Sequence, residues 1–475
     1  MIMWKTEADV LTPKEINDYI TTYQNEVVPG LDDLWAYYIG KNPGILGRTA
    51  GDPNNPDNRT PVPYGRKIIT TFVGYAYRPK YTTYKASDDA QAPYVAQLQA
   101  TFDLSDEHIK TSRAGRNSAI YGAAYELLYI DGDQADPRFV SVDPREMILL
   151  YDYSPEPKKK IGIRFYRITD KLWKVEAYYE DRIELYDRVR SEGRWTPGEE
   201  QWRLVPTGTA PNYFGEPPIV AYHFGDERVG LIAPVVPLID DYDIVVSDSI
   251  NEFSRFAHAY MLLVKYNLVP PELKKEAGAI SKALQRLKQL RIFENLPDKD
   301  AVSFLTKDIP KEFIEFMTDR LKEEIHEQSH VPDFNEMAGG QMTGAAIERM
   351  MFDFENVVSS AEADFDMGLL DRIRLINVIY AKAGKLVDTE HSVVIMHKRN
   401  MPLNLQEFAT TAVQLKQAGF SRYLIADIMP DDIVPNVEEE LERQDKDMEA
   451  LLPDVDAFEK EGDDVEGTRL DAESR

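Results

Sequence analysis

The sequence contains no cysteine in its 475 residues. This absence excludes disulfide frameworks, thiolate metal sites and cysteine nucleophiles, and it agrees with a reducing compartment. The first ten residues show no basic segment followed by an apolar one, and no run approaches the roughly 18 apolar residues of a membrane span. We therefore expect a soluble intracellular protein with no membrane partner.

Basic residues are scarce, with 55 Lys and Arg against 82 Asp and Glu and a formal net charge of −27. Affinity for nucleic-acid phosphates comes largely from Lys and Arg, so this balance argues against a protein that grips nucleic acid. The charge is unevenly placed. Residues 427–475 hold 19 acidic and five basic residues, whereas residues 265–309 hold nine basic and six acidic ones.

Common catalytic motifs are also missing from the sequence. It has no G-x-x-x-x-G-K-[ST] phosphate loop, no G-x-S-x-G elbow and no dinucleotide fingerprint. We therefore expect a non-enzymatic protein without a cofactor. Its length allows two or three domains, and its 43% hydrophobic content is ordinary for a folded protein.

An amphipathic helix is predicted directly after Pro234 and Pro237. Asp240, Asp241 and Asp243 fall in its first turns, where negative charge complements the exposed N–H groups. Polar residues such as Asp243, Ser247, Asn251 and Arg255 lie between the apolar positions. Apolar residues recur every three or four positions at Ile239, Tyr242, Val246, Ile250, Phe253, Phe256, Tyr260 and Val264.

A second helix is predicted from Lys311 to Ser329, and Pro332 ends it because proline lacks an N–H and crowds the preceding residue. A loop with Gly339, Gly340 and Gly344 follows, and its glycines make it flexible. The predicted apolar face of this helix comprises Phe313, Met317, Leu321 and Ile325.

The rest of the chain is predicted to combine helices with an antiparallel β region at residues 124–224. Residues 1–50 look helical, with a cap at Thr12. The tail after Pro453 is polar and charged, which is typical of a mobile segment. Further helices are expected at 64–73, 106–121, 345–383, 405–418 and 437–452, and a strand at 391–397.

Several segments of the chain, taken in their order along the sequence, resemble the portal proteins of tailed double-stranded-DNA bacteriophages, in the siphophage branch of Gram-positive hosts. The helix, basic insert, helix and glycine loop described above complete the set. The resemblance covers most of the chain. The matching segments are residues 37–41 (YYIGK), 63–69 (PYGRKII) with 73–75 (VGY), 139–144 (FVSVDP) and 214–220 (FGEPPIV).

The resemblance implies an α+β portal fold made of five parts: an α/β wing, a two-helix stem, a small α/β clip, a tunnel loop with a long kinked helix, and a short helical crown. The short crown is where this chain departs from the family. The implied boundaries are 1–235 with 369–425 for the wing, 236–264 and 310–331 for the stem, 265–309 for the clip, 332–368 for the tunnel loop and long helix, and 426–475 for the crown and acidic tail.

The resemblance also implies a function. Such proteins form a ring, usually of twelve copies, at the capsid vertex of the virion, after assembly in the host cytoplasm. Double-stranded DNA is packaged through the ring by the terminase and is later ejected. The expected partners are the other copies, the terminase large subunit, the head-tail connector, and the major capsid and scaffolding proteins.

An acidic channel suits this function, because each strong phosphate contact would have to be broken as the DNA advances. The implied tunnel loop offers polar and soft apolar side chains without a strong cation. The candidate DNA-channel residues are Asn335, Glu336, Met337, Gly339, Gly340, Gln341, Met342 and Thr343.

The basic insert is a candidate docking surface for the packaging motor and the connector, by electrostatic steering onto an acidic partner. A solvated helix face is the plainer interpretation, because residues 281–288 have ordinary helical periodicity. The candidate docking residues are Lys274, Lys275, Lys282, Arg286, Lys288 and Arg291.

The alternative function is a zinc metalloprotease. His326, Glu327 and His330 fit the H-E-x-x-H pattern, with Glu348 downstream as a third ligand to consider. The pattern is short, the chain holds seven histidines, and Pro332 stops the helix just past the second histidine. We therefore favour a charged, solvated helix end over a metal site.

Overall fold

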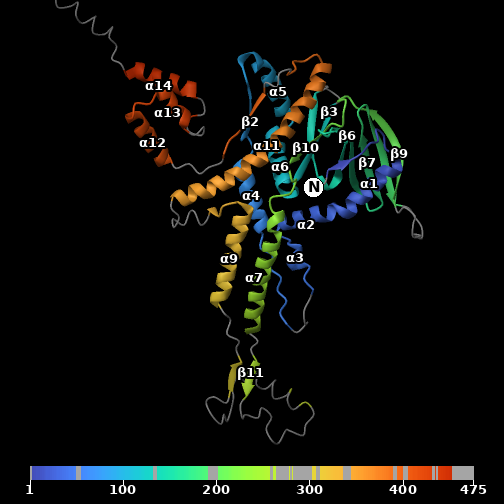
Figure 1. The fold of residues 1–475 in the computed structure, drawn as a ribbon, viewed down its shortest axis with the longest axis vertical. Coiled ribbons are helices and arrows are strands. Elements are labelled where there is room, and N and C mark those ends of the chain that lie inside the picture. The colour runs from blue at the N-terminus through green and yellow to red at the C-terminus, as the bar shows by residue number, and fades with distance from the viewer. Residues whose placement is uncertain are drawn as a thin grey trace, which may run out of the picture. The chain divides into compact units, whose positions relative to one another are not determined.

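The computed structural model describes residues 3–49, 55–131, 136–190, 202–256, 260–263, 302–305, 311–334, 344–388, 393–399, 405–429 and 437–451, with the single positions 278, 281 and 434. The chain forms two compact units, residues 1–400 and 401–475. The fold mixes helices and strands, as predicted (Figure 1).

The first unit begins with a short strand and four helices. These are β1 (Trp4–Lys5), α1 (Pro13–Glu26), α2 (Val28–Ile39), α3 (Pro43–Leu46) and α4 (Tyr64–Ala76). The predicted cap at Thr12 is confirmed: its hydroxyl accepts from the N–H of Glu15, whose carboxylate accepts from the N–H of Thr12. Gly40 ends α2 at φ 75°, a left-handed conformation that glycine adopts without strain.

The predicted antiparallel β region is confirmed and forms two sheets. One has the order β1-β5-β6-β7-β8-β9, in which β1 runs parallel to β5 and the other neighbours are antiparallel. The other has the antiparallel order β10-β3-β4. The strands are β3 (Ala123–Ile130), β4 (Pro137–Val142), β5 (Met147–Tyr151), β6 (Lys159–Thr169), β7 (Leu172–Tyr178), β8 (Arg182–Arg190), β9 (Trp202–Pro211) and β10 (Ile219–His223), with the 3₁₀ turn η2 (Pro144–Glu146) before β5.

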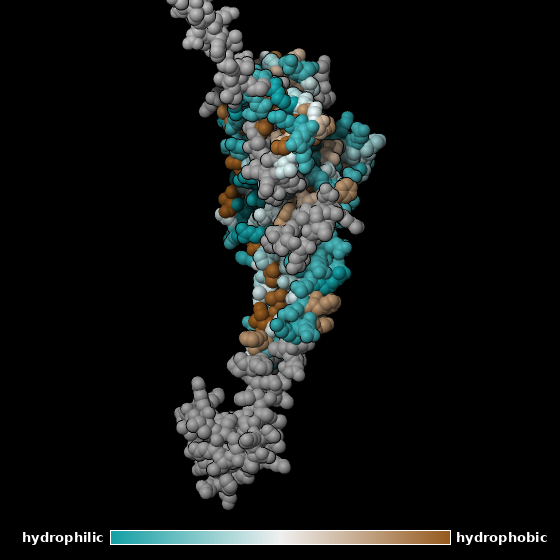
Figure 2. Space-filling view, turned by 90° about the vertical axis from the view of Figure 1, so that its left-hand side faces the viewer, coloured by the Kyte–Doolittle hydropathy of each residue, from teal (hydrophilic) through white to brown (hydrophobic). Residues whose placement is uncertain are grey.

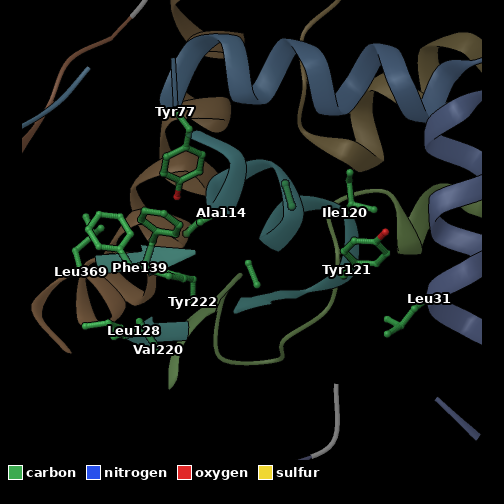
Figure 3. Close-up of a cluster of buried hydrophobic side chains, with 14 of the residues drawn as sticks. Leu31, Tyr77, Ala114, Ile120, Tyr121, Leu128, Phe139, Val220, Tyr222 and Leu369 are labelled. Carbon is green, nitrogen blue, oxygen red and sulfur yellow. The ribbon is translucent and has the colours of Figure 1, made fainter. Parts of the chain in front are cut away.

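Helices α5 (Ala92–Leu104), α6 (Glu107–Tyr121) and α11 (Gly344–Lys382) pack around the three-stranded sheet, and α11 bends along its length (Figure 1). Figure 3 shows Leu369 of α11 beside Tyr222 of β10 and Phe139 of β4 in this core. A Cβ on Gly368 would lie 2.5 Å from the Tyr222 ring, so only glycine lets α11 approach β10 so closely. The 3₁₀ turn η1 (Asp89–Gln91) precedes α5.

Two strands that are distant in sequence pair beside α11. Strand β2 (Thr82–Ala86) is antiparallel to β13 (Val393–His397), which confirms the strand expected at 391–397. Neither β2 nor α5 was predicted from the sequence, because β2 has only five residues and the apolar pattern of α5 is weak.

Two long helices lie side by side after the turn η3 (Ala233–Val235) (Figure 1). They are α7 (Val236–Phe256) and α9 (Lys311–Ser329), and both were predicted. The predicted end of the first helix is wrong: Tyr260–Leu263 form strand β11, antiparallel to β12 (Val302–Leu305). The apolar run at 260–263 fits either period, and its strand partner is too distant in sequence for local spacing to reveal.

The second unit contains α12 (Leu405–Gln417), α13 (Arg422–Ile428) and α14 (Val437–Leu451). The Ser421 hydroxyl caps α13 by accepting from the N–H of Leu424, and Arg422 pairs with Asp445 of α14 at 2.8 Å. This unit comprises residues 401–475. None of the helices in the described ranges is long and apolar enough to cross a membrane.

Candidate functional site

The sequence-based candidates for DNA contact and docking fall outside the described residues. These are the tunnel loop, 335–343, and the basic clip residues Lys274, Lys275, Lys282, Arg286, Lys288 and Arg291. The described helices α7 and α9, which we call the stem, and the helix α11 that begins at Gly344 border these segments in the chain. The candidate site is therefore built from the stem and its attachments.

Helix α7 buries polar residues and exposes apolar ones from Asp243 onward. An amphipathic helix ordinarily buries its apolar stripe. Here Asp243 and Ser247 have no exposed surface and Asn251 is 7% exposed, whereas Phe253 is 72% exposed. The polar face of α7 is therefore turned into its own chain. On the apolar face Ile239 is fully buried, but Ile250 and Phe253 are left outside.

The buried polar side chains of α7 bind the backbone of an extended segment, residues 58–62, which runs beside the helix (the blue trace beyond α3 in Figure 1). Each accepts one backbone N–H. The three hydrogen bonds run from Val62 N to Asp243 Oδ1 (2.8 Å), from Thr60 N to Ser247 Oγ (2.9 Å) and from Asn58 N to Asn251 Oδ1 (2.7 Å).

Additional contacts attach the first half of α7 to α2 and α3. The hydroxyl of Tyr37 donates to Asp240 at 2.7 Å. Asn42 donates to both Asp243 (2.5 Å) and the carbonyl of Val62 (3.1 Å). A Cβ on Gly44 would lie 2.1 Å from an oxygen of Asp240, so a larger residue would displace the Asp240 side chain from its present position.

Asp243 is a buried carboxylate held by neutral donors. Its pKa is raised to about 6, chiefly by burial and also by the nearby charge of Asp240, while hydrogen bonds from Asn42 and Val62 act in the opposite direction. The group therefore titrates close to neutral pH.

Helix α9 buries one face and exposes aromatic rings on another. Leu321 and Ile325 are buried as predicted, but Phe313, expected on the same face, is 60% exposed and Phe316 is 63% exposed. We call Phe253 of α7 and Phe313 and Phe316 of α9 the exposed stem phenylalanines. Figure 2 shows hydrophobic residues gathered on the surface of the stem helices.

The H-E-x-x-H pattern does not form a zinc site in the described structure. Helix α9 ends at Ser329, and His330 follows it at φ 55°, off the helical path. The Nδ1–H of His326 donates to the carbonyl of Val331 (2.8 Å), and its Nε2 lies 3.3 Å from Nζ of Lys67. Burial, with the nearby Lys67 charge, lowers the pKa of His326, so the ring is neutral and accepts from Lys67.

No group of three or more histidine, aspartate or glutamate side chains in the described part of the chain is arranged to hold a metal. The side chain of Glu348 lies outside the described residues. Nothing in this geometry supports the metalloprotease alternative.

Asp333 fixes the chain just before the tunnel-loop segment. Its side chain is 3% exposed and pairs with Lys67 of α4 (3.0 Å) and Lys322 of α9 (2.8 Å). A hollow of about 460 Å³ adjoins this junction. Asp319, Glu323, Glu327, His330, Met350 and Asp353 contribute to its lining. Asp333, just before the tunnel-loop segment, is thus held beside a hollow lined mostly by charged residues.

Arg372 of α11 joins the elements around the three-stranded sheet. Its guanidinium is fully buried and pairs with Glu107 of α6 (3.0 Å) and Glu126 of β3 (2.9 Å). Tyr222 also donates to Glu126, at 2.6 Å. The sequence reasoning missed this cluster, although a glutamate inside the apolar strand 125–130 was a signal for a buried partner.

Comparisons with known proteins agree on one family. The family model described as "Phage portal protein, SPP1 Gp6-like" matches residues 17–451. The portal protein of Bacillus phage SPP1 is 22% identical over 332 residues, covering 68% of this chain and 63% of that relative. The match thus spans somewhat less than two thirds of the relative's length.

Two solved structures are also similar. A chain in the virion of a native gene transfer agent particle aligns with a TM-score of 0.45 at 10% identity, covering 83% of this chain and 92% of that one. A chain in the neck of an empty gene transfer agent particle, computed with C6 symmetry, aligns with a TM-score of 0.44 at 10% identity, covering 77% and 90%. Because the family model extends over most of the sequence, this chain belongs to the phage portal proteins of the SPP1 Gp6-like family.

Proposed function

We propose that this chain assembles into a closed ring at a capsid vertex and serves as the conduit for double-stranded DNA during packaging and ejection. Family membership supports the portal role. The observation that carries the ring is the exposure of the stem phenylalanines. Successive copies would meet through two different patches, and such a contact closes by rotation.

The exposed stem phenylalanines are costly for a monomer. Full burial of a phenylalanine is worth about 1.5–3 kcal/mol, and soluble monomers rarely expose large contiguous apolar patches. The polar face of α7 is already bound to residues 58–62 of the same chain. The apolar face is then the part of α7 available to another copy.

The acidity of the chain suits a channel through which DNA must slide freely. Exposed carboxylates of α9, including Glu323 and Glu327, add to the formal charge of −27 per chain. Twelve copies would carry roughly −300, which counterions would screen. In this proposal the protein has a structural role and no catalytic one, and the energy for packaging comes from the terminase.

The parts of the ring are assigned as the family resemblance implies. The wing comprises 1–235 and 369–425, the stem 236–264 and 310–331, of which 260–263 form strand β11 and not helix, the clip 265–309, the tunnel loop and long helix 332–368, and the crown 426–475. The remaining proposed partners are the head-tail connector and the major capsid and scaffolding proteins. The proposed location is the portal vertex of the virion and, during assembly, the host cytoplasm.

The tunnel loop is proposed to follow the passing DNA without gripping it. Replacing Gly339 and Gly340 with bulky residues should stiffen the loop and reduce packaging of a full genome. Unchanged packaging by this variant would show that an adaptive loop is not needed.

The clip is proposed to dock the terminase large subunit and, later, the connector. Charge reversal at Lys282, Arg286 and Lys288 should weaken terminase binding, most clearly at low salt. Reversal at Lys311, an 83% exposed residue on α9, is the matched control. Equal binding by both variants would remove the docking role.

The ring itself is tested by negative-stain imaging of the purified chain together with its mass distribution in solution. Wild type should show rings with a central hole. Phe253→Glu combined with Phe316→Glu should give monomers, whereas Ile168→Glu, at a 53% exposed position of β6, should leave the rings intact. A wild-type chain that stays monomeric at high concentration would contradict the proposal.

A further inference from the structure

The contact between α7 and residues 58–62 has the features of a binding site for extended polypeptide backbone. Its acceptors Asp243, Ser247 and Asn251 are spaced four residues apart on the helix, or about 6.0 Å per step at 1.5 Å per residue. The amides they bind are spaced two residues apart, or about 6.6 Å in an extended chain. The two repeats match closely enough for three successive hydrogen bonds.

The sequence of the segment matches this register. The bound N–H groups belong to the even positions 58, 60 and 62, and the prolines Pro61 and Pro63, which have no N–H, occupy odd positions. Each proline also biases the residue before it, Thr60 or Val62, toward an extended conformation. The segment is therefore biased toward an extended conformation before it binds, which lowers the entropy lost on binding.

We propose that residues 58–62 form a releasable strap on α7, and that Asp243 is the group through which pH controls the closed fraction of the strap. The ligand class is an extended backbone, and the occupant is this segment of the same chain. The proposal concerns the chain itself, so it stands whether or not the ring forms.

Asp243 is suited to this role because its carboxylate is fully buried and one of the groups that cover it is the strap amide of Val62. It faces the amide of Asn42 and the N–H of Val62, both neutral donors. The charged and titratable groups on the packed elements include Asp240 and Tyr37, which bond to each other, the ion pair of Arg48 with Asp248 at 2.8 Å, and Arg59 of the strap, which pairs with Asp57 at 2.7 Å. Tyr37 stays neutral because burial raises its pKa, and the charge of Asp240 disfavours ionisation of Asp243.

The sign of the pH effect follows from linkage. When the strap opens, water reaches Asp243 and its pKa returns toward the ordinary 3.8, whereas in the closed state it is about 6. The closed strap therefore binds a proton more tightly than the open one, and acid favours closure. Between about pH 5 and about pH 8 the opening constant should rise roughly tenfold.

Hydrogen–deuterium exchange of the peptide that covers residues 58–62 tests the strap, after correction for the intrinsic chemical rate. Wild type should show the roughly tenfold rise in opening. Asp243→Asn keeps an acceptor for Val62 but cannot ionise, so its corrected exchange should be independent of pH.

Two serine variants of α7 separate pH control from simple loss of a contact. Ser247→Ala removes one acceptor and should raise exchange about fivefold at every pH, with the pH dependence retained. Ser249→Ala is the matched control, because the Ser249 hydroxyl bonds only within its helix, to the carbonyl of Val245 in the structure. It should leave the exchange of the strap unchanged.

A corrected exchange rate in wild type that does not vary with pH would overturn the proposal, even if Asp243→Asn failed to fold. An equal pH dependence in wild type and Asp243→Asn would also overturn it. Loss of rings in the imaging experiment, with the exchange pattern intact, would reject the proposed function and leave the strap in place.

Discussion

At the scale of single residues, two buried arginines are held in different ways. Arg372 pairs with the carboxylates of Glu107 and Glu126. Arg188, on β8, is 1% exposed and donates to the side-chain oxygens of Asn17, Thr21 and Gln24 on α1, none of which is charged. Burial accordingly lowers the pKa of Arg188 to about 10. The desolvation of the Arg188 charge is therefore not offset by a carboxylate, whereas that of the Arg372 charge is.

Methionine substitution should separate the two arginines. Arg372→Met leaves two carboxylates buried without a cation and should lower the free energy of unfolding by about 3–5 kcal/mol. Arg188→Met removes a cation that is held by neutral groups and should cost no more than about 2 kcal/mol, because the lost hydrogen bonds are offset by relief of desolvation. Urea denaturation of both variants measures the difference. Equal losses would mean that the carboxylates stabilise Arg372 no more than the neutral oxygens stabilise Arg188.

His326 should make stability depend on pH in the direction opposite to Asp243. Its folded pKa lies below the ordinary 6.5, so below that pH the unfolded chain takes up a proton that the folded chain resists. Its contribution to stability is therefore lost as the pH falls from about 7.

This pH effect is measured by urea denaturation of His326→Asn and wild type across the acidic range. The variant cannot titrate, so it should lose less stability than wild type as the pH falls. His330→Asn, at an exposed position, should behave like wild type. Stoichiometric zinc that stabilises wild type but not His326→Asn would instead revive the metal site.

At the scale of elements, local spacing located the helices well but did not determine which of their faces is buried. The prediction of 311–329 for α9 is confirmed at both ends, and the prolines and aspartates mark the start of α7 correctly. The reversed polarity of α7 was not predicted, because its acceptors bind residues 181 to 193 positions away in the sequence. A polar residue on a helix face indicates either water or a partner, and periodicity cannot distinguish the two.

The two faces of α9 should respond differently to alanine substitution. Ile325→Ala empties a fully buried position and should lower the free energy of unfolding by about 2–5 kcal/mol. Phe316→Ala removes a side chain that is 63% exposed and should cost less than about 1 kcal/mol in the dissociated chain. Thermal unfolding at a dilution where the chain is monomeric measures both. A large loss for Phe316→Ala under those conditions would show that its ring is buried within one chain.

At the scale of the whole molecule, the fold class and the order of its parts were within reach of the sequence, while the pairing of distant segments was not. Strand β2 pairs with β13 across most of the chain, with Thr82 opposite His397, and nothing local to either strand indicates the other. The same holds for the glutamates that meet Arg372, which come from α6 and β3. Such contacts depend on the assembled fold, and the local pattern around one residue does not indicate which distant residue it contacts.

The net charge of −27 sets a condition on assembly of the proposed ring. Neighbouring copies repel one another, and salt shortens the range of that repulsion from about 30 Å at 0.01 M to about 3 Å at 1 M. Apolar contacts such as those proposed for the stem phenylalanines are not weakened by salt in this way. The fraction of chains in rings should therefore rise between about 20 mM and about 500 mM salt.

Mass photometry at a fixed protein concentration measures this fraction. Phe253→Glu with Phe316→Glu should stay monomeric throughout, because screening restores no apolar contact. Rings that dissociate as salt is added would mean that ion pairs between copies, rather than the exposed stem phenylalanines, hold the ring together.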